Sequence, residues 1–270
     1  IKVVDMGCQT FDPKNNNLEK ILSHKLTTEK QKIAVENLFK EKKIISKISV
    51  EDFFIALGCE RYSSIDINGD WGSFSYDLNY NLIDEYNFNE KYDLVINNGT
   101  SEHLFNQYSF FKNAHELCKE DGLMIHILPF IGYVNHGFFN YPPLFFIDLA
   151  AANEYEITKI SFCNRDGAEL IVDKERYINI CTQIRQKAIY KKSFLSEIID
   201  ISKNKIGEDF FILAVLKKIN NENFTIPLQG KYLSDIKTTE HSNKYITKKK
   251  GSEHAGGQNP DKDKRKDLNN

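Results

Sequence analysis

The stretch YDLVINNGTSEHLFNQ, residues 92–107, joins a core-type strand directly to a dense polar cluster. Tyr92 to Ile96 is a short apolar run of the kind that a buried strand uses. The next residues are two Asn, a Gly, two hydroxyl side chains and the acid–imidazole pair Glu102-His103. In a parallel sheet, ligands bind beyond the carboxyl ends of the strands. We therefore expect this cluster to form part of the rim of a ligand cleft.

Segments with strand character alternate with segments of helix character on both sides of this stretch. LMIHILPF, residues 123–130, is continuously apolar, which is typical of a strand in a sheet that is covered on both faces. The alternation predicts an α/β fold with a mostly parallel sheet and helices on both faces. The expected strands lie at residues 2–7, 62–68, 74–78, 92–97, 123–130, 156–164 and 209–219.

The helices are predicted from apolar residues at three- and four-residue spacing. Residues 142–155 begin with two prolines, which are favoured at a helix start, and residues 174–200 also have helical spacing. A long helical tract from about Leu18 to Gly58 is read as an insertion, with Ser49 as the N-cap of its last helix and Gly58 as the stop. In the helix expected over 107–119, the buried stripe consists of Phe110, Phe111, Ala114, Leu117 and Cys118.

One domain over residues 1–220 is expected, followed by a C-terminal extension over residues 221–270. From about residue 239 the chain consists mainly of Lys, Asn, Asp, Gly and Ser, so we expect disorder there. The Lys-rich end contains interspersed acids and is read as a solvated tail rather than as a nucleic-acid arm. The start at Ile1, without Met and directly before a strand, suggests that an upstream element is missing.

Composition excludes several classes of partner. The 270 residues are 41% hydrophobic and 27% charged, and the net charge of −2 provides no field for nucleic acid or an anionic membrane. No apolar run approaches the roughly 18–20 residues of a membrane span. The five cysteines are scattered and odd in number, which favours reduced thiols and a cytoplasmic location. The seven histidines lack metal-ligand spacing, so no metal is expected.

The polar strand ends favour a nucleoside ligand. VVDMGCQ, residues 3–9, has only one of the glycines of a dinucleotide turn, and Gln9 stands where a diphosphate needs close backbone approach. Asp66 could accept both ribose hydroxyls, and Asp77 an adenine amine, with the Leu78 backbone at the neighbouring ring nitrogen. The alternative for either acid is a turn residue that bonds its own backbone. A nucleoside without a diphosphate suits this pattern better than a nicotinamide cofactor.

Six motifs in this order resemble those of a class I S-adenosylmethionine-dependent methyltransferase. More narrowly, they resemble a bacterial subset with a DxGxQ first motif and a GTxEH run after the fourth strand. The resemblance covers roughly Lys2 to Tyr155, while the insertion 18–58 and the missing helix before the first strand depart from the simplest pattern. It implies a Rossmann-like sheet of seven strands with the last strand antiparallel. The motifs are DMGCQ (5–9), SIDIN (64–68), YDLN (76–79), YDLVINNGTSEH (92–103), DGLMIHILP (121–129) and GYVNHGFFNY (132–141).

The resemblance implies S-adenosylmethionine as the cofactor and gives each site residue a role. Asp5 would order the first turn, Gly7 would let the backbone approach the amino-acid moiety, and Asn97 to Gly99 would line the methionine and sulfonium end. Asp66 would bind the ribose and Asp77 the adenine. The implied cofactor-binding residues are Asp5, Gly7, Cys8, Gln9, Asp66, Ile67, Asp77, Leu78, Asn97, Asn98 and Gly99.

Methyl transfer is an in-line displacement, and it needs a base only when the acceptor loses a proton. Glu102, His103 and His136 are the candidate catalytic residues, and we expect His136 to be the base on the substrate side. His136 lies in a glycine-flanked loop whose four aromatic residues could wall an acceptor pocket or fill a hydrophobic plug. For His103 the alternative is packing at a helix terminus. His126, in an apolar strand, is read as a core residue.

The sequence therefore predicts S-adenosylmethionine-dependent methyl transfer to a small molecule, such as a sugar or another metabolite. The alternative is a catalytically silent, methyltransferase-like module that binds a nucleoside and acts as a scaffold or regulatory subunit. No nucleic-acid or membrane partner is expected. The sequence does not determine the oligomeric state.

Overall fold

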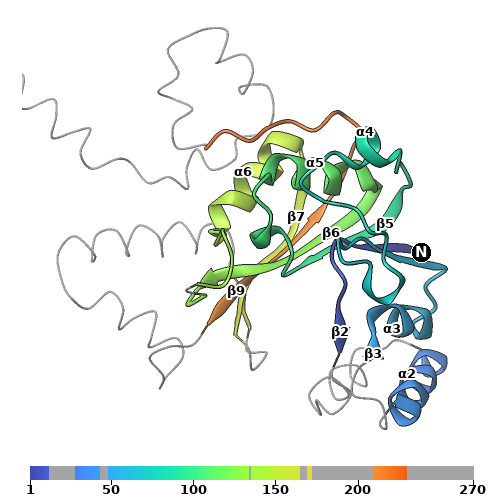
Figure 1. Cartoon of the computed structure of the whole chain (residues 1–270). Helices are drawn as coiled ribbons and strands as arrows, with labels where there is room; N and C mark the ends of the chain where they lie inside the picture. The colour runs from blue at the N-terminus through green and yellow to red at the C-terminus, as the bar shows by residue number, and fades with distance from the viewer. Residues whose placement is uncertain (12–27, 43–47, 134, 165–168, 172–208, 230–270) are drawn as a thin grey trace, which may run out of the picture. The chain divides into compact units, whose positions relative to one another are not determined.

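The computed structural model divides into two units, Ile1–His126 and Ile127–Asn270. Figure 1 shows the helices and strands of the described residues. The predicted helix over 174–200 and the tail beyond residue 229 lie outside the described part of the chain. The domain boundary expected at residue 220 stays a prediction. The described residues are 1–11, 28–42, 48–133, 135–164, 169–171 and 209–229.

The first unit contains the parallel part of the sheet. Strands β1 (Lys2–Asp5), β4 (Arg61–Ser64) and β5 (Tyr92–Asn98) lie in it in the order β4-β1-β5. Next to β5 is β6 (Cys118–Ile131), which begins in the first unit and ends in the second. β1 pairs in parallel with both β4 and β5. The apolar run that predicted β1 accounts for its burial, since Val3 and Val4 are fully enclosed. β6 begins five residues before the predicted 123–130 strand, directly at the end of the preceding helix.

Helix α5 (Gln107–Leu117) follows the polar cluster and confirms the predicted amphipathic pattern. Asn106 caps its start by accepting from Ser109 N–H at 3.1 Å. A one-turn 3₁₀ helix, η2 (Ser101–His103), lies between β5 and α5. The predicted stripe is buried at every position: Phe110, Phe111, Ala114, Leu117 and Cys118.

The insertion is not one continuous helical tract. Its described parts are α2 (Glu29–Lys42), β3 (Ile48–Ser49) and α3 (Val50–Ala56), and β3 pairs antiparallel with β2 (Thr10–Phe11). The β-branched Ile48 favours a strand, and it is fully buried against Val35 of α2, so tertiary packing ends the helical tract here. The predicted cap is confirmed, because Ser49 Oγ accepts from Asp52 N–H at 3.1 Å.

The second unit contains the antiparallel strands. β7 (Glu156–Asn164) pairs antiparallel with β9 (Phe210–Lys217) and with β8 (Glu169–Ile171). These pairings confirm the two predicted closing strands. Helix α6 (Pro143–Asn153) begins with proline, as expected, because this residue lacks the N–H that the first turn of a helix leaves unpaired.

The α/β fold class is confirmed, but the strands of the seven-stranded sheet differ from the prediction at two places. The sheet has seven strands, with parallel pairing in the first unit and antiparallel pairing in the second. Residues 74–78 are not a strand, since only Phe74 forms an isolated bridge with Ile65. The short strand β8 was not expected. Among the described residues no helix is long and apolar enough to cross a membrane.

Candidate functional site

Three strand ends lie at the same level in the first unit. In the parallel register, Asp5 of β1 is opposite Ser64 of β4 and Ile96 of β5. The chain leaves β1 for β4 on one side and later returns to pair as β5 on the other, so strand order reverses at β1. Such a reversal is where ligands bind in open α/β sheets. Most of the sequence-predicted cofactor residues follow these three strands.

The turn after β1 requires glycine. Gly7 has φ +149°, a backbone conformation that residues with a Cβ rarely adopt, and a Cβ there would collide with Thr100 Oγ1. The same turn is tied to the end of β5, because Gln9 Nε2 donates to the Asn98 carbonyl at 2.8 Å. The structure thus brings Gly7, Gln9 and Asn98 together, and their role in cofactor binding stays a prediction.

Asp66 reaches back to the first turn. Its Oδ2 accepts from Cys8 N–H at 3.2 Å, and its Oδ1 accepts from Asn68 N–H at 3.2 Å. Burial, together with the nearby Asp66, Asp5 and Asp70 carboxylates, raises the pKa of the Cys8 thiol, so the thiol stays protonated and is a poor nucleophile. Ile67, the next predicted residue, is 66% exposed beside Asp66.

Asp5 is buried beneath the turn with an incomplete set of partners. Tyr62 OH donates to its Oδ2 at 3.3 Å, while Oδ1 is buried and has no hydrogen-bond partner. Burial raises the pKa of Asp5 to about 8, against the lowering effect of the Tyr62 hydrogen bond. A buried carboxyl oxygen without a partner is costly, so this atom calls for a donor such as a water, an ion or a ligand.

Asn97 points into the protein core. It is fully buried, its Oδ1 accepts from Ser101 N–H at 3.2 Å, and its Nδ2 donates to Ser101 Oγ at 3.0 Å. Nδ2 also lies 3.2 Å from Nδ1 of His126. The side chain is therefore occupied by these partners, and any contact of Asn97 with a cofactor would come from its backbone.

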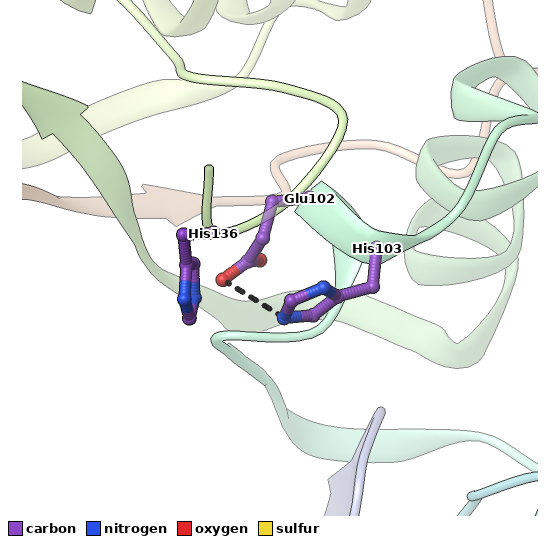
Figure 2. Close-up of side chains that lie close together, drawn as sticks. All are labelled: Glu102, His103 and His136. Atoms are coloured by element: carbon purple, nitrogen blue, oxygen red, sulfur yellow. Dashed lines mark ion pairs between the residues drawn. The ribbon is translucent and has the colours of Figure 1, made fainter. Parts of the chain in front are cut away.

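Glu102 and His103, both on η2, lie within ion-pair distance of each other (Figure 2). His103 Nε2 lies 3.9 Å from Glu102 Oε1; the carboxylate is buried, whereas 47% of the imidazole is exposed. Gly99, directly before this segment, has φ +69°, a left-handed conformation that favours glycine. A buried carboxylate next to a half-exposed imidazole can hold the ring in one orientation.

Asp77 and Leu78 are placed differently from the residues above. Asp77 Oδ1 accepts from both the backbone N–H and the side-chain amide of Asn79, at 2.9 Å each, and Asp77 N–H donates to Tyr86 OH at 3.1 Å. This is the turn geometry that was the alternative reading of this acid. Leu78 is buried. Their assignment to adenine stays a prediction.

His136 belongs to the second unit and is described with it. It is exposed on the loop after β6, and its ring lies 5.3 Å from that of Tyr133. Of the other loop aromatics, Phe138 is 69% exposed, whereas Tyr141 is buried and packs on Phe145 of α6. Tyr141 is thus a core residue rather than a free wall of a pocket.

Sequence reasoning missed the residues that support the site from behind. Thr100 packs on the Gly7 turn, Tyr62 bonds Asp5, and Ser101 and His126 bond Asn97. Each of these residues either lies far from its partner in the sequence or was considered only as part of a longer motif. The one available signal was the GTSEH run, in which Thr100 and Ser101 follow Gly99 directly.

No protein-family profile and no curated protein sequence matches the chain. One solved structure to which the chain is similar is the O-methyltransferase of a trans-AT PKS multienzyme from Brevibacillus brevis, in complex with S-adenosyl-L-homocysteine. It is 14% identical over 83% of this chain and 68% of that chain, with a TM-score of 0.39. The StiE O-MT is 13% identical over 80% and 67%, with a TM-score of 0.33. These values are too low to carry an argument about activity.

Proposed function

We propose that the chain is an S-adenosylmethionine-dependent methyltransferase that acts on a small-molecule acceptor. The observation that carries the proposal is the joining of the turn after β1 to both neighbouring strand ends, through Cys8–Asp66 and Gln9–Asn98. This places a glycine turn, a carboxylate and exposed backbone at the point where strand order reverses. One glycine and no phosphate cradle suit a nucleoside better than a dinucleotide.

Two features of the first unit fit this cofactor. The buried Asp5 Oδ1 has no partner in the protein, and the ammonium group of the cofactor's amino-acid part is the kind of donor it lacks. Gly7 at φ +149° gives the turn after β1 a backbone path that a residue with a Cβ rarely adopts, and Thr100 packs where that Cβ would lie. Asp66 would hold the ribose hydroxyls, because each of its oxygens accepts only one backbone N–H and retains a free lone pair.

The cofactor supplies an electrophilic methyl group on a sulfonium, and the chain supplies orientation and proton handling. We assign the proton of a hydroxyl-type acceptor to the His103 imidazole, since its side chain is 47% exposed and lies 3.9 Å from the buried Glu102 carboxylate. The carboxylate would stabilise the imidazolium formed when the proton arrives. Since the acceptor then attacks as a stronger nucleophile, the pair would act on the transfer step rather than on cofactor binding.

His136 remains the second proposed base. It is exposed on a loop beside Tyr133, as a residue facing an acceptor would be. The identity of the acceptor, including the proposal of a sugar or related metabolite, rests on composition and on this loop. Neither nucleic acid nor a membrane is proposed as a partner, and a cytoplasmic location is proposed from the cysteine pattern alone.

The test is transfer of a labelled methyl group. The protein is incubated with methyl-labelled S-adenosylmethionine and a panel of small hydroxylated acceptors, and label in the product and release of S-adenosylhomocysteine are measured. Transfer above the protein-free rate supports the proposal. Cofactor binding without transfer to any member of a broad panel would favour the alternative, a silent nucleoside-binding module.

A further inference from the structure

The buried amide of Asn97 has a fixed orientation. Ser101 N–H can only donate, so the Asn97 atom that faces it at 3.2 Å is the carbonyl oxygen. The other end of the amide, Nδ2, then carries two hydrogens and has two partners, Ser101 Oγ at 3.0 Å and His126 Nδ1 at 3.2 Å. A flipped amide would place two donors face to face at Ser101.

His126 must therefore accept a hydrogen bond at Nδ1. An amide NH₂ group only donates, so Nδ1 carries no proton and the neutral ring has its proton on Nε2. His126 is fully enclosed in β6, and this burial lowers its pKa to about 3, which keeps the ring neutral at physiological pH. The ring of Phe111 lies 5.5 Å away, so one neighbour of the imidazole is apolar.

The segment held by this amide is the one that carries the proposed proton-handling pair. Ser101 is the first residue of η2, and Glu102 and His103 are the next two. Ser101 is fixed at its N–H and its hydroxyl by Asn97, and at its carbonyl by Gln107 Nε2 at 2.7 Å. The position of the Glu102 carboxylate thus depends on an anchor one residue away.

We propose that His126 is a positioning residue: through Asn97 it fixes Ser101 and, with it, the Glu102–His103 pair. The catalytic consequence rests on the proposed function, but the anchoring itself does not. His126 acts from the strand β6 on a loop after β5 and touches neither cofactor nor acceptor in this role. Position 126 therefore requires a neutral hydrogen-bond acceptor where His126 Nδ1 now lies.

The test compares two substitutions at one position. His126→Phe keeps a ring of similar size but removes the acceptor, whereas His126→Asn keeps an oxygen able to accept from Asn97 Nδ2. Hydrogen exchange is followed by NMR at the Ser101 amide, with the Ile65 amide, bonded to the Asp5 carbonyl at 2.9 Å, as the reference. The expected result is exchange at Ser101 at least about tenfold faster in His126→Phe and near wild type in His126→Asn.

A substitution in the same strand controls for packing. Met124 is buried two residues before His126 on the same face of β6, so Met124→Leu changes the core without touching the amide. Protection of the Ser101 amide that is unchanged in both His126→Phe and Met124→Leu would overturn the proposal. An equal loss of this protection in His126→Phe, His126→Asn and Met124→Leu would overturn it too. If His126→Phe does not fold, His126→Leu takes its place.

The effect of His126 on catalysis is measured in a separate experiment. With an acceptor that the wild type methylates, His126→Phe is expected to lower kcat for S-adenosylhomocysteine release about tenfold or more while leaving the Kd for S-adenosylhomocysteine unchanged, and His126→Asn restores kcat. A fall in cofactor affinity with unchanged kcat would contradict positioning of the pair. If the wild type binds no S-adenosylmethionine, the proposed function fails, and the exchange experiment still decides the role of His126.

Discussion

The backbone N–H of Cys8 donates to Asp66 Oδ2 at 3.2 Å, across a separation of 58 residues in the sequence. This bond ties the turn after β1 to the end of β4 and orients the Asp66 carboxylate. A carboxylate held by two backbone N–H groups is pre-organised for a ligand with paired hydroxyls, because little side-chain freedom is left to lose on binding. The relationship is the basis of the nucleoside site proposed here.

Substitution of Gly7 by Ala is expected to destabilise the first unit. The added Cβ would collide with Thr100 Oγ1, and alanine at this position would have an unfavourable φ. We therefore expect a loss of about 1–3 kcal/mol in the free energy of unfolding, measured with urea. Gly58→Ala is the control, since Gly58 has φ +89° but open space around its Cβ position. Adding Thr100→Ala should recover part of the loss in the Gly7→Ala protein. Equal effects of the Gly7 and Gly58 substitutions would show that the Thr100 contact is unimportant.

Asp5→Asn is expected to change the pH dependence of stability. Burial raises the folded-state pKa of Asp5 to about 8 from an ordinary value near 4, so over this range the folded chain binds a proton that the unfolded chain has lost. The Asp5 contribution to the free energy of unfolding therefore falls as pH rises from 4 to 8. Relative to wild type, Asp5→Asn should gain stability steadily over this interval in urea unfolding series. A pH-independent difference would mean that Asp5 is ionised in the folded protein.

His126 is expected to contribute to acid lability. Its folded-state pKa of about 3 lies below the ordinary value, so from pH 6.5 downward the unfolded chain binds a proton that the folded chain does not. The stability that His126 provides is complete above pH 6.5 and is lost as pH falls toward 3. The stability difference between wild type and His126→Asn should shrink between pH 7 and pH 4. A constant difference would argue that the buried ring is protonated.

The two candidate bases can be separated by turnover. If Glu102 and His103 act as a pair, His103→Ala should lower kcat for methyl transfer about 100-fold, and Glu102→Gln should lower it by a similar or smaller factor, with unchanged affinity for S-adenosylhomocysteine. His136→Ala serves as the comparison, because this residue was the base expected from sequence. A large loss in His136→Ala with full activity in His103→Ala would reverse the assignment.

The spacing of residues along the chain predicted the helix features that depend on neighbouring residues in the sequence. The stripe of α5, the proline start of α6 and the Ser49 cap of α3 depend on neighbours three or four residues away. Residues 74–78 were misread because Phe74 and Tyr76 alternate as in a strand. In the structure they pack into an aromatic cluster instead. The ring centroids of Tyr76 and Tyr86 lie 4.2 Å apart in a stacked arrangement, and those of Phe74 and Phe88 lie 5.1 Å apart.

The candidate site was predictable in outline but not in its supporting contacts. The strand ends identified Gly7, Gln9, Asp66 and Asn98, since parallel strands bring their carboxyl ends together. The orientation of Asn97 depends on His126, 29 residues away, and no spacing rule reports that contact. It could be seen only after β5 and β6 were placed.

The central claim is that the Asp66 carboxylate and the turn after β1 bind the nucleoside of S-adenosylmethionine. It is tested most directly by calorimetric titration of the protein with S-adenosylmethionine, S-adenosylhomocysteine and NAD, beside the Asp66→Ala variant and an Asp84→Ala control in α4 (Leu82–Tyr86). We expect the first two ligands to bind, with affinity about 10- to 100-fold weaker in Asp66→Ala and unchanged in Asp84→Ala. Binding of NAD alone, or equal affinity in wild type and Asp66→Ala, would contradict it.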